Sequence, residues 1–165
     1  MIPAFLKRRV LGELFALTAR GFELEAPGLR GLSYAETLEA YARFTSREAA
    51  RALAGGMGEA VRRSLLGLAR ERGAGLRRLL RIRTMEKAMV LARLGYDLLG
   101  IDFSADGQGG VCMAGCFFKD YYSPEICRLM SALDEGLLCG LCGRDELRFS
   151  RRLTEGGASC LARLA

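Results

Sequence analysis

The stretch IDFSADGQGGVCMAGCFF, residues 101–118, decides the fold because the sequence pattern changes there. Residues 101–104 alternate between apolar and polar side chains, residues 111–118 are rich in apolar ones, and the segment 105–110 between them has turn-forming composition. Alternation with a period of two is typical of strands, and a short glycine-rich segment between two such runs predicts a hairpin. Strand-forming sequence therefore begins just after Gly100.

Helical periodicity dominates the hundred residues before this hairpin. Helices are expected over about residues 3–20, 33–53, 58–72 and 84–99. Ser33 and Thr84 are suitable N-caps for the second and fourth of these, since a hydroxyl can accept a hydrogen bond from a free N–H of the first turn. Glycines at 73 and 75 are expected to end the third helix, with a short continuation after them.

A helix and a second hairpin are expected after the first hairpin. Ser123 and Pro124 predict the start of a helix that runs to about Leu141. Residues 147–153 alternate, and residues 159–164 follow a glycine-containing turn, as expected for two more strands. The fold class is therefore α+β, with a four-stranded antiparallel sheet of order β-β-α-β-β and a covering helix.

Size and composition favour a single domain spanning residues 1–165, with a mainly helical part (1–100) and a cysteine-bearing α/β part (101–165). Half of the residues are apolar, which is enough for one sizeable core but not for two independent ones. The opening segment, residues 1–17, carries three consecutive cations and resembles neither a signal peptide nor a membrane span. We therefore expect a cytoplasmic protein without a membrane partner.

Charge is uneven along the chain. The first hundred residues carry 18 Lys and Arg against 10 Asp and Glu, and the remainder carries 7 against 9. Eight of the arginines lie between Arg62 and Arg83, interleaved with leucines and without aromatic residues. This pattern favours the solvated faces of amphipathic helices over a nucleic-acid interface, with attraction of an anionic substrate or an acidic partner as the alternative.

All six cysteines lie in the last third of the chain, at positions 112, 116, 127, 139, 142 and 160, and histidine is absent. Chemistry at a site here must therefore use thiolates, carboxylates or a bound metal. Cys112 and Cys116 lie on one expected strand about 13 Å apart, so both can approach one ion only if the strand bulges between them. Cys127, Asp134 and Cys160 are expected to converge where the helix covers the sheet.

Cys139 and Cys142 form a CxxC motif. This spacing occurs in metal sites and in dithiol redox sites, but no second CxxC accompanies it, so a four-cysteine zinc ribbon is not indicated. Ordinary partly buried cysteines, a metal or cluster role, and redox chemistry all remain open for this pair.

The segment from Cys116 to Cys160 resembles the L-2-amino-thiazoline-4-carboxylic acid hydrolase family. That family's C-terminal pattern has a strand cysteine, a helix cysteine, a following aspartate and an Arg-Thr-Gly-Cys series. Matching residues here are Cys116, Cys127, Asp134, Arg151, Thr154, Gly156 and Cys160. The same order of elements looks like the 4-vinyl-reductase-type domain, whose cysteines can bind zinc. The resemblance covers about the last 55 residues and implies a hydrolase that opens a small sulfur and nitrogen heterocycle.

Under this resemblance Asp134 is the expected acid/base, and Cys116 or Cys127 is an expected nucleophile. Arg151 could bind a substrate carboxylate, and Thr154 of the matched pattern is a further expected substrate-binding residue. Tyr122, an expected substrate-binding residue, and Tyr121 would line the pocket entrance, with packing as the alternative role. Cys127 and Cys160 are implied metal ligands, with Cys116 as the third ligand and Cys112, Asp134 or water completing the site. The implied cofactor is zinc or an iron-sulfur cluster.

Partners follow from the same hypothesis. We expect a small-molecule substrate or ligand and no nucleic acid, and a homo-oligomer is left open. A non-catalytic small-molecule or metal-binding sensor module is the alternative, since it would use the same residues without needing an acid/base group.

Overall fold

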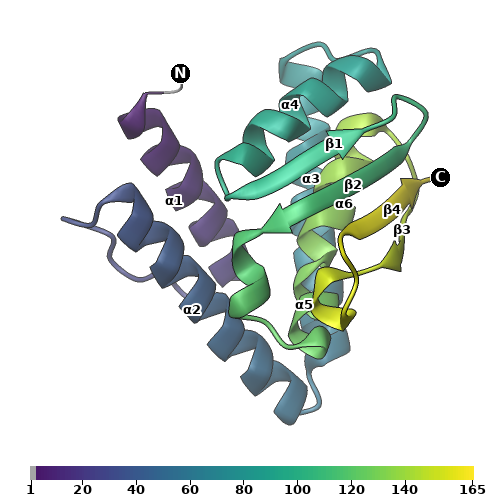
Figure 1. The fold of residues 1–165 in the computed structure, drawn as a ribbon. Coiled ribbons are helices and arrows are strands. Elements are labelled where there is room, and N and C mark those ends of the chain that lie inside the picture. The colour runs from purple at the N-terminus through teal and green to yellow at the C-terminus, as the bar shows by residue number, and fades with distance from the viewer. Residues whose placement is uncertain (1–2) are drawn as a thin grey trace.

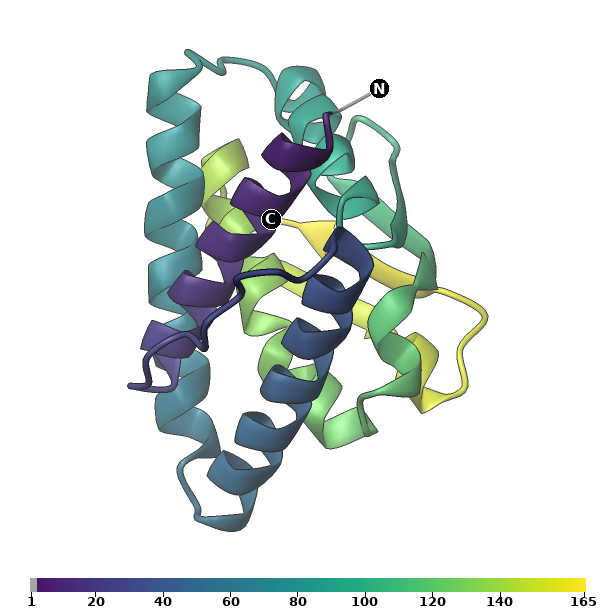
Figure 2. The ribbon, with the colours of Figure 1, turned by 90° about the vertical axis from the view of Figure 1, so that its left-hand side faces the viewer.

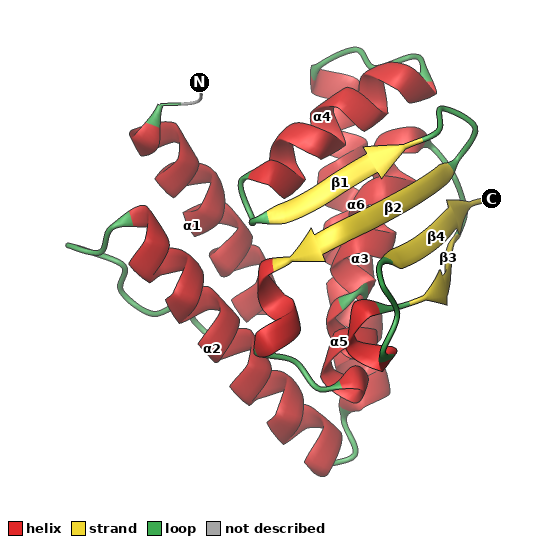
Figure 3. Cartoon of the chain, in the orientation of Figure 1, coloured by secondary structure: helices red, strands yellow, loops and turns green. Residues whose placement is uncertain are grey.

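The structure is a computed structural model that describes residues 3–165, so Met1 and Ile2 of the opening segment lie outside the described residues. Figure 1 traces the chain through its elements. In order these are α1 (Ala4–Gly21), α2 (Tyr34–Ala54), α3 (Gly58–Leu79), α4 (Met85–Asp97), β1 (Ile101–Ala105), β2 (Gly110–Cys116), a 3-10 turn (Phe117–Asp120), α5 (Pro124–Met130), α6 (Ala132–Cys142), β3 (Leu147–Arg151), a second 3-10 turn (Leu153–Glu155) and β4 (Cys160–Leu164). The expected α+β class is confirmed, with helices first and a four-stranded antiparallel sheet after them (Figure 3).

The sheet has the strand order β1-β2-β4-β3, and every neighbouring pair is antiparallel. The two hairpins therefore meet through their inner strands, with Val111 of β2 opposite Ala162 of β4. Gly109 lies at φ 99°, in the left-handed region that favours glycine, and its carbonyl accepts the Leu164 N–H. The glycine-rich turn thus also ties the end of β4 to the first hairpin.

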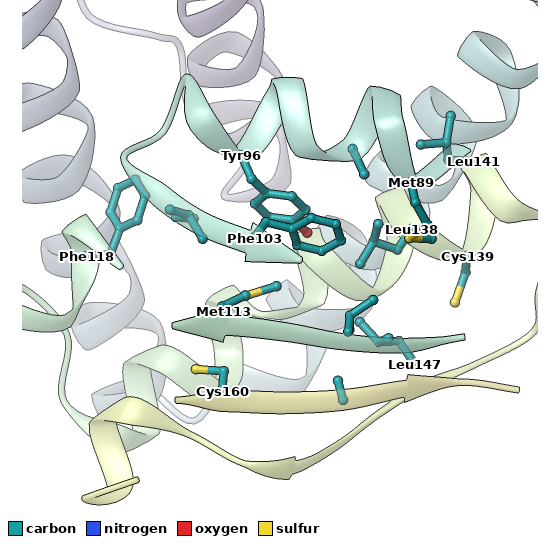
Figure 4. Packing of buried hydrophobic residues seen from close by; sticks show 14 of the residues in the cluster. Met89, Tyr96, Phe103, Met113, Phe118, Leu138, Cys139, Leu141, Leu147 and Cys160 are labelled. Atoms are coloured by element: carbon teal, nitrogen blue, oxygen red, sulfur yellow. The ribbon is translucent and has the colours of Figure 1, made fainter. Parts of the chain in front are cut away.

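Helices cover one face of the sheet. Figure 2 shows α6 between the sheet and α3, with α1 and α2 in front of them in this view. The inner residues of the strands, such as Phe103, Val111 and Met113, share one core with Leu138 of α6. Tyr96 of α4 stacks on Phe103 with ring centroids 4.6 Å apart, at the centre of the packing in Figure 4.

Helices α3 and α6 touch backbone to backbone. A Cβ added at Gly140 would lie 2.2 Å from the carbonyl oxygen of Arg70, and one added at Gly136 would lie 2.3 Å from that of Leu66. Gly73 of α3 faces α6 in the same way, 2.3 Å from the Leu137 carbonyl oxygen. The expected break of the third helix at Gly73 is therefore wrong, because this glycine permits close helix packing and α3 continues to Leu79.

The expected helix caps are present. Ser33 forms a capping box with Glu36, and the Thr84 and Ser123 hydroxyls accept hydrogen bonds from first-turn N–H groups. The helix expected from Pro124 to Leu141 is divided at Ser131, whose ψ of −7° departs from helical geometry and whose hydroxyl donates to the Arg128 carbonyl. Two shorter helices, α5 and α6, result.

Several arginines of the basic segment are held by internal contacts. Arg62 pairs with Glu135, Arg72 pairs with Glu13, and Arg70 donates to the Arg144 carbonyl at 2.9 Å. Some arginines of the basic segment therefore link α3 to α6 and to α1. Separately, none of the helices in residues 3–165 is both long and apolar enough to cross a membrane.

Candidate functional site

A β-bulge separates Cys112 from Cys116. Asp102 pairs with Gly115 and Phe103 with Met113, which leaves Ala114 without a partner on β1. The extra residue reverses the alternation, so Cys116 shares the inner face with Met113 whereas Cys112 faces outward opposite Leu161. The bulge required for Cys112 to join Cys116 exists, but it sends the two thiols to opposite faces.

Three cysteines surround the inner end of the sheet near Asp134. Cys116 ends β2, Cys127 lies on α5 and Cys160 begins β4. Asp134 and the thiolate forms of Cys127 and Cys160 lie close enough to Cys116 to raise its pKa. The backbone N–H of Leu153 donates to the Cys160 sulfur at 3.3 Å, which fixes this thiol beside the second 3-10 turn. Four residues from four elements thus form one group, which we call the Asp134 cluster.

Asp134 lies in the first turn of α6, where it accepts a hydrogen bond from the Tyr96 hydroxyl at 2.9 Å. Burial raises the pKa of Asp134 to about 6, although the Tyr96 hydrogen bond and the Arg152 guanidinium oppose the shift. The residue keeps part of its surface exposed. A half-buried carboxyl that titrates close to neutral pH can both take and give a proton under ordinary conditions.

Burial favours the protonated thiol at Cys116 and Cys160. Burial raises the pKa of Cys116 to about 12, with Asp134 and the two other cysteines adding to the shift and the Phe118 N–H opposing it. Burial also raises the pKa of Cys160. Because the thiolate is the reactive form of cysteine, Cys116 as it stands is a poor nucleophile at neutral pH.

Tyrosines close the helical side of the cluster. Tyr122 and Thr45 share a hydroxyl hydrogen bond of 2.6 Å, and Tyr41 and Thr18 share one of 3.0 Å. Burial raises the pKa of Tyr122 and of Tyr41, and the charge of Asp134 adds to both shifts. Tyr122 is half-buried whereas Tyr41 is fully buried. Tyr122 therefore lies beside the cluster, and its place at a pocket entrance stays a prediction.

The structure brings Arg152, not Arg151, to the cluster. A second bulge leaves Ser150 unpaired, so Arg151 pairs with Leu161 on the outer face and donates to the Ser159 hydroxyl at 3.1 Å. Arg152 keeps 14% of its side-chain surface exposed, and its guanidinium carbon lies 4.0 Å from the centroid of the Phe149 ring. Sequence reasoning missed Arg152 because a one-residue bulge in β3 was not visible in the alternation.

Thr154 of the second 3-10 turn carries a buried hydroxyl that has no hydrogen-bond partner among the described residues. A buried hydroxyl without a partner is costly, so such an atom calls for an explanation. Thr154 follows Leu153, whose N–H holds Cys160. Thr154 is therefore the chain neighbour of a residue that contacts the Asp134 cluster.

The CxxC motif occupies a different place. Cys139 and Cys142 lie in the last turns of α6, and burial raises the pKa of each thiol to about 11. The negative end of the helix macrodipole also disfavours thiolate there, in contrast to redox CxxC motifs at helix N-termini. The arrangement favours packing over redox chemistry for this pair.

Thiolates bind zinc and iron-sulfur clusters, so the chemistry of these donors suits the implied cofactors. Their arrangement does not. Within residues 3–165, no three or more Cys, Asp or Glu side chains are placed so that they could jointly hold a metal ion. The metal role expected for Cys116, Cys127, Cys160 and Cys112 stays a prediction, and Cys112 lies on the other face of the sheet from Cys116.

Comparison of the chain with family models, with curated proteins and with solved structures finds no match in any of the three.

As the pH rises, the wild type should lose folding stability relative to an Asp134→Asn variant. The folded-state pKa of Asp134, about 6, lies above its ordinary value of 3.8, so the stabilisation from the protonated form is complete below about pH 4 and is lost as pH rises through 6. Urea unfolding at pH 4.5 and pH 8 should show the variant gaining about 2 kcal/mol over the wild type between these pH values. An unchanged difference would mean that Asp134 is not a buried acid.

Proposed function

We propose that this protein is a hydrolase of a small sulfur and nitrogen heterocycle, of the kind exemplified by L-2-amino-thiazoline-4-carboxylate, and that the Asp134 cluster is its active site. The observation that carries the proposal is the half-buried Asp134 carboxyl, whose pKa is about 6. Burial raises this pKa, and the Tyr96 hydrogen bond and the Arg152 charge partly oppose the rise. A carboxyl that titrates near neutrality beside a cation suits proton transfer to a bound anionic substrate. The resemblance of residues 116–160 to the hydrolase family points to the same chemistry.

In the proposed reaction, the Asp134 carboxylate takes a proton from water while the water oxygen bonds to the ring carbon between nitrogen and sulfur. The carbon-nitrogen double bond opens as this bond forms, and the Asp134 carboxyl gives the proton to the ring nitrogen. The Asp134 carboxylate then takes the proton of the new hydroxyl, which becomes a carbonyl as the carbon-sulfur bond breaks, and returns it so that the leaving sulfur becomes a thiol. One water is consumed, and its two hydrogens end on the ring nitrogen and on the sulfur. The Tyr96 hydroxyl, 2.9 Å from the Asp134 oxygen, orients the carboxyl for both transfers.

Water is the favoured nucleophile because the Cys116 thiol has a pKa of about 12. Cys127, on α5, keeps its place as the alternative nucleophile in a covalent route. A Cys127→Ala variant separates the two routes, since a water route retains turnover whereas a covalent route through this sulfur loses it.

Arg152 is the proposed carboxylate-binding residue in place of Arg151. An Arg152→Gln variant should raise KM about tenfold or more with a smaller change in kcat, because it removes charge-assisted hydrogen bonds to the substrate carboxylate. Arg151→Gln is the matched control, since this neighbour lies on the outer face and should leave KM unchanged. Equal effects of the two substitutions would contradict the assignment.

A non-catalytic binding module is the second candidate. Burial raises the pKa of Cys116 to about 12 and also raises the pKa of Cys160, which favours such a module because the thiolate is the nucleophilic form of cysteine. Such a module would bind the aminothiazoline carboxylate without converting it, and an Asp134→Asn variant would still bind. Elemental analysis after anaerobic purification tests the zinc or iron-sulfur expectation. Metal at near-stoichiometric amounts would show that the cysteines rearrange around it.

Incubation of the protein with L-2-amino-thiazoline-4-carboxylate tests the proposal. The expected result is a product one water heavier, detected by mass spectrometry, together with a new thiol that reacts with a thiol reagent. Binding without such a product would support the binding module instead. If the protein neither binds nor converts this compound, the compound is not its substrate.

A further inference from the structure

One end of the molecule exposes an unusual share of its large apolar side chains. Phe5 and Leu79 keep 73% and 77% of their surface exposed, and Val90 of α4 keeps 60%. The start of α1, the end of α3 and the outer face of α4 together expose Phe5, Leu6, Val10, Leu79, Leu80, Val90 and Leu94. Figures 1 and 2 both place these segments at the same end, which we call the α1/α4 end.

Cations dominate the segments that form the α1/α4 end. Residues 5–13 and 78–97 contain eight Lys and Arg against three acidic residues. The cations are Lys7, Arg8, Arg9, Arg78, Arg81, Arg83, Lys87 and Arg93, and the acids are Glu13, Glu86 and Asp97. Glu13 is already engaged with Arg72 and Arg9. The α1/α4 end therefore combines exposed apolar side chains with a large uncompensated positive charge.

A surface hollow lies at the start of α1. Its volume is about 390 Å³, and it is lined by Phe5, Arg8, Arg9, Gly12, Leu29 and Thr37. The hollow places an apolar ring beside two guanidinium groups, which suits a ligand that carries both a hydrocarbon portion and a negative charge.

We propose that the α1/α4 end docks on the surface of a bilayer that contains anionic lipid. Apolar side chains among cations are the signature of binding in the plane of a membrane interface, where the apolar groups enter the headgroup region and the cations meet the lipid charge. A second copy of the chain is disfavoured as the occupant because two positively charged ends repel each other. The apolar residues are spread over three helices instead of lining one groove, which favours an extended surface over a peptide.

This inference departs from the expectation that the protein has no membrane partner, and it concerns surface attachment without a spanning helix. It does not depend on the proposed hydrolase activity, because the α1/α4 end contains none of the residues of the Asp134 cluster. Loss of turnover and loss of lipid binding can therefore be observed separately.

Co-sedimentation with lipid vesicles tests the inference. The full-length protein should pellet with phosphatidylcholine vesicles that contain about one third phosphatidylserine, remain in solution with pure phosphatidylcholine vesicles, and detach at high salt. Val90→Ser with Leu94→Ser, and separately Lys87→Glu with Arg93→Glu, should each lower the partition coefficient about tenfold or more. These side chains are exposed, so circular dichroism should show an unchanged fold.

Leu53→Ser with Met57→Ser is the matched control, because these two exposed apolar residues lie at the end of α2 and in the turn before α3, away from the α1/α4 end. This control should bind vesicles as the wild type does. Equal partition into neutral and anionic vesicles, or equal losses from the two apolar pairs, would overturn the proposal. Binding to poly-L-glutamate but not to vesicles would also overturn it and would indicate an acidic protein partner instead.

Discussion

Replacing Gly140 with valine is expected to destabilise the fold more than any other single change proposed for this protein. The new Cβ would lie 2.2 Å from the Arg70 carbonyl oxygen and 2.8 Å from the Ala74 nitrogen, both backbone atoms of α3. Relief requires the two helices to move apart and so disturbs the packing around α6. The expected loss is about 3 kcal/mol, which corresponds to a fall in Tm of roughly 10 °C measured by thermal unfolding.

Gly67→Ala is the matched control for Gly140→Val. Gly67 also lies within α3, but a Cβ added there has no atom within 4 Å. The substitution should stabilise the protein by about 0.5 to 1 kcal/mol because alanine has the higher helix propensity. A Gly140→Val variant as stable as Gly67→Ala would contradict the close approach of α3 and α6.

Replacing Asp134 with asparagine is expected to lower turnover of L-2-amino-thiazoline-4-carboxylate by at least about a hundredfold, the usual contribution of a general acid/base group. Asparagine keeps the oxygen that accepts the Tyr96 hydroxyl but cannot take up and return a proton. The loss should appear in kcat, because the substrate still meets Arg152 and the other residues of the cluster. Steady-state kinetics at pH 7.5 measures the effect.

Asp102→Asn provides the comparison for Asp134→Asn. Asp102 is an exposed aspartate that pairs with Gly115 in the sheet, so its replacement should leave kcat within about twofold. The acid/base role fails if Asp134→Asn retains wild-type kcat while its circular dichroism spectrum shows a native fold. Tight binding of the substrate by both the wild type and the variant, without turnover, would favour the binding module.

Much of the fold followed from local chemistry in the sequence. Strand alternation located both hairpins, and hydroxyl caps at Ser33, Thr84 and Ser123 located three helix starts. Local periodicity succeeds here because each element buries one regular face. The sequence pattern also predicts that Asp134, Cys127 and Cys160 converge where the helix covers the sheet.

Features that depend on tertiary packing were not predictable in this way. Gly73 carries the turn-forming signal of any glycine, and only its contact with α6 explains why α3 continues through it. The bulges at Ala114 and Ser150 insert one residue each and therefore exchange the faces of the residues that follow. The first exchange places Cys116 on the inner face while Cys112 stays on the outer one, and the second brings Arg152 to the cluster in place of Arg151.

Titration of the Asp134 carboxyl carbon by ¹³C NMR, with and without L-2-amino-thiazoline-4-carboxylate, tests whether the Asp134 cluster is the functional site. The signal is assigned by its absence in the Asp134→Asn variant. We expect a pKa of about 6 in the free protein and a clear change in both chemical shift and pKa when the ligand binds. A carboxyl that titrates at the ordinary aspartate value, or that does not respond to the ligand, would contradict the claim that the Asp134 cluster is the functional site.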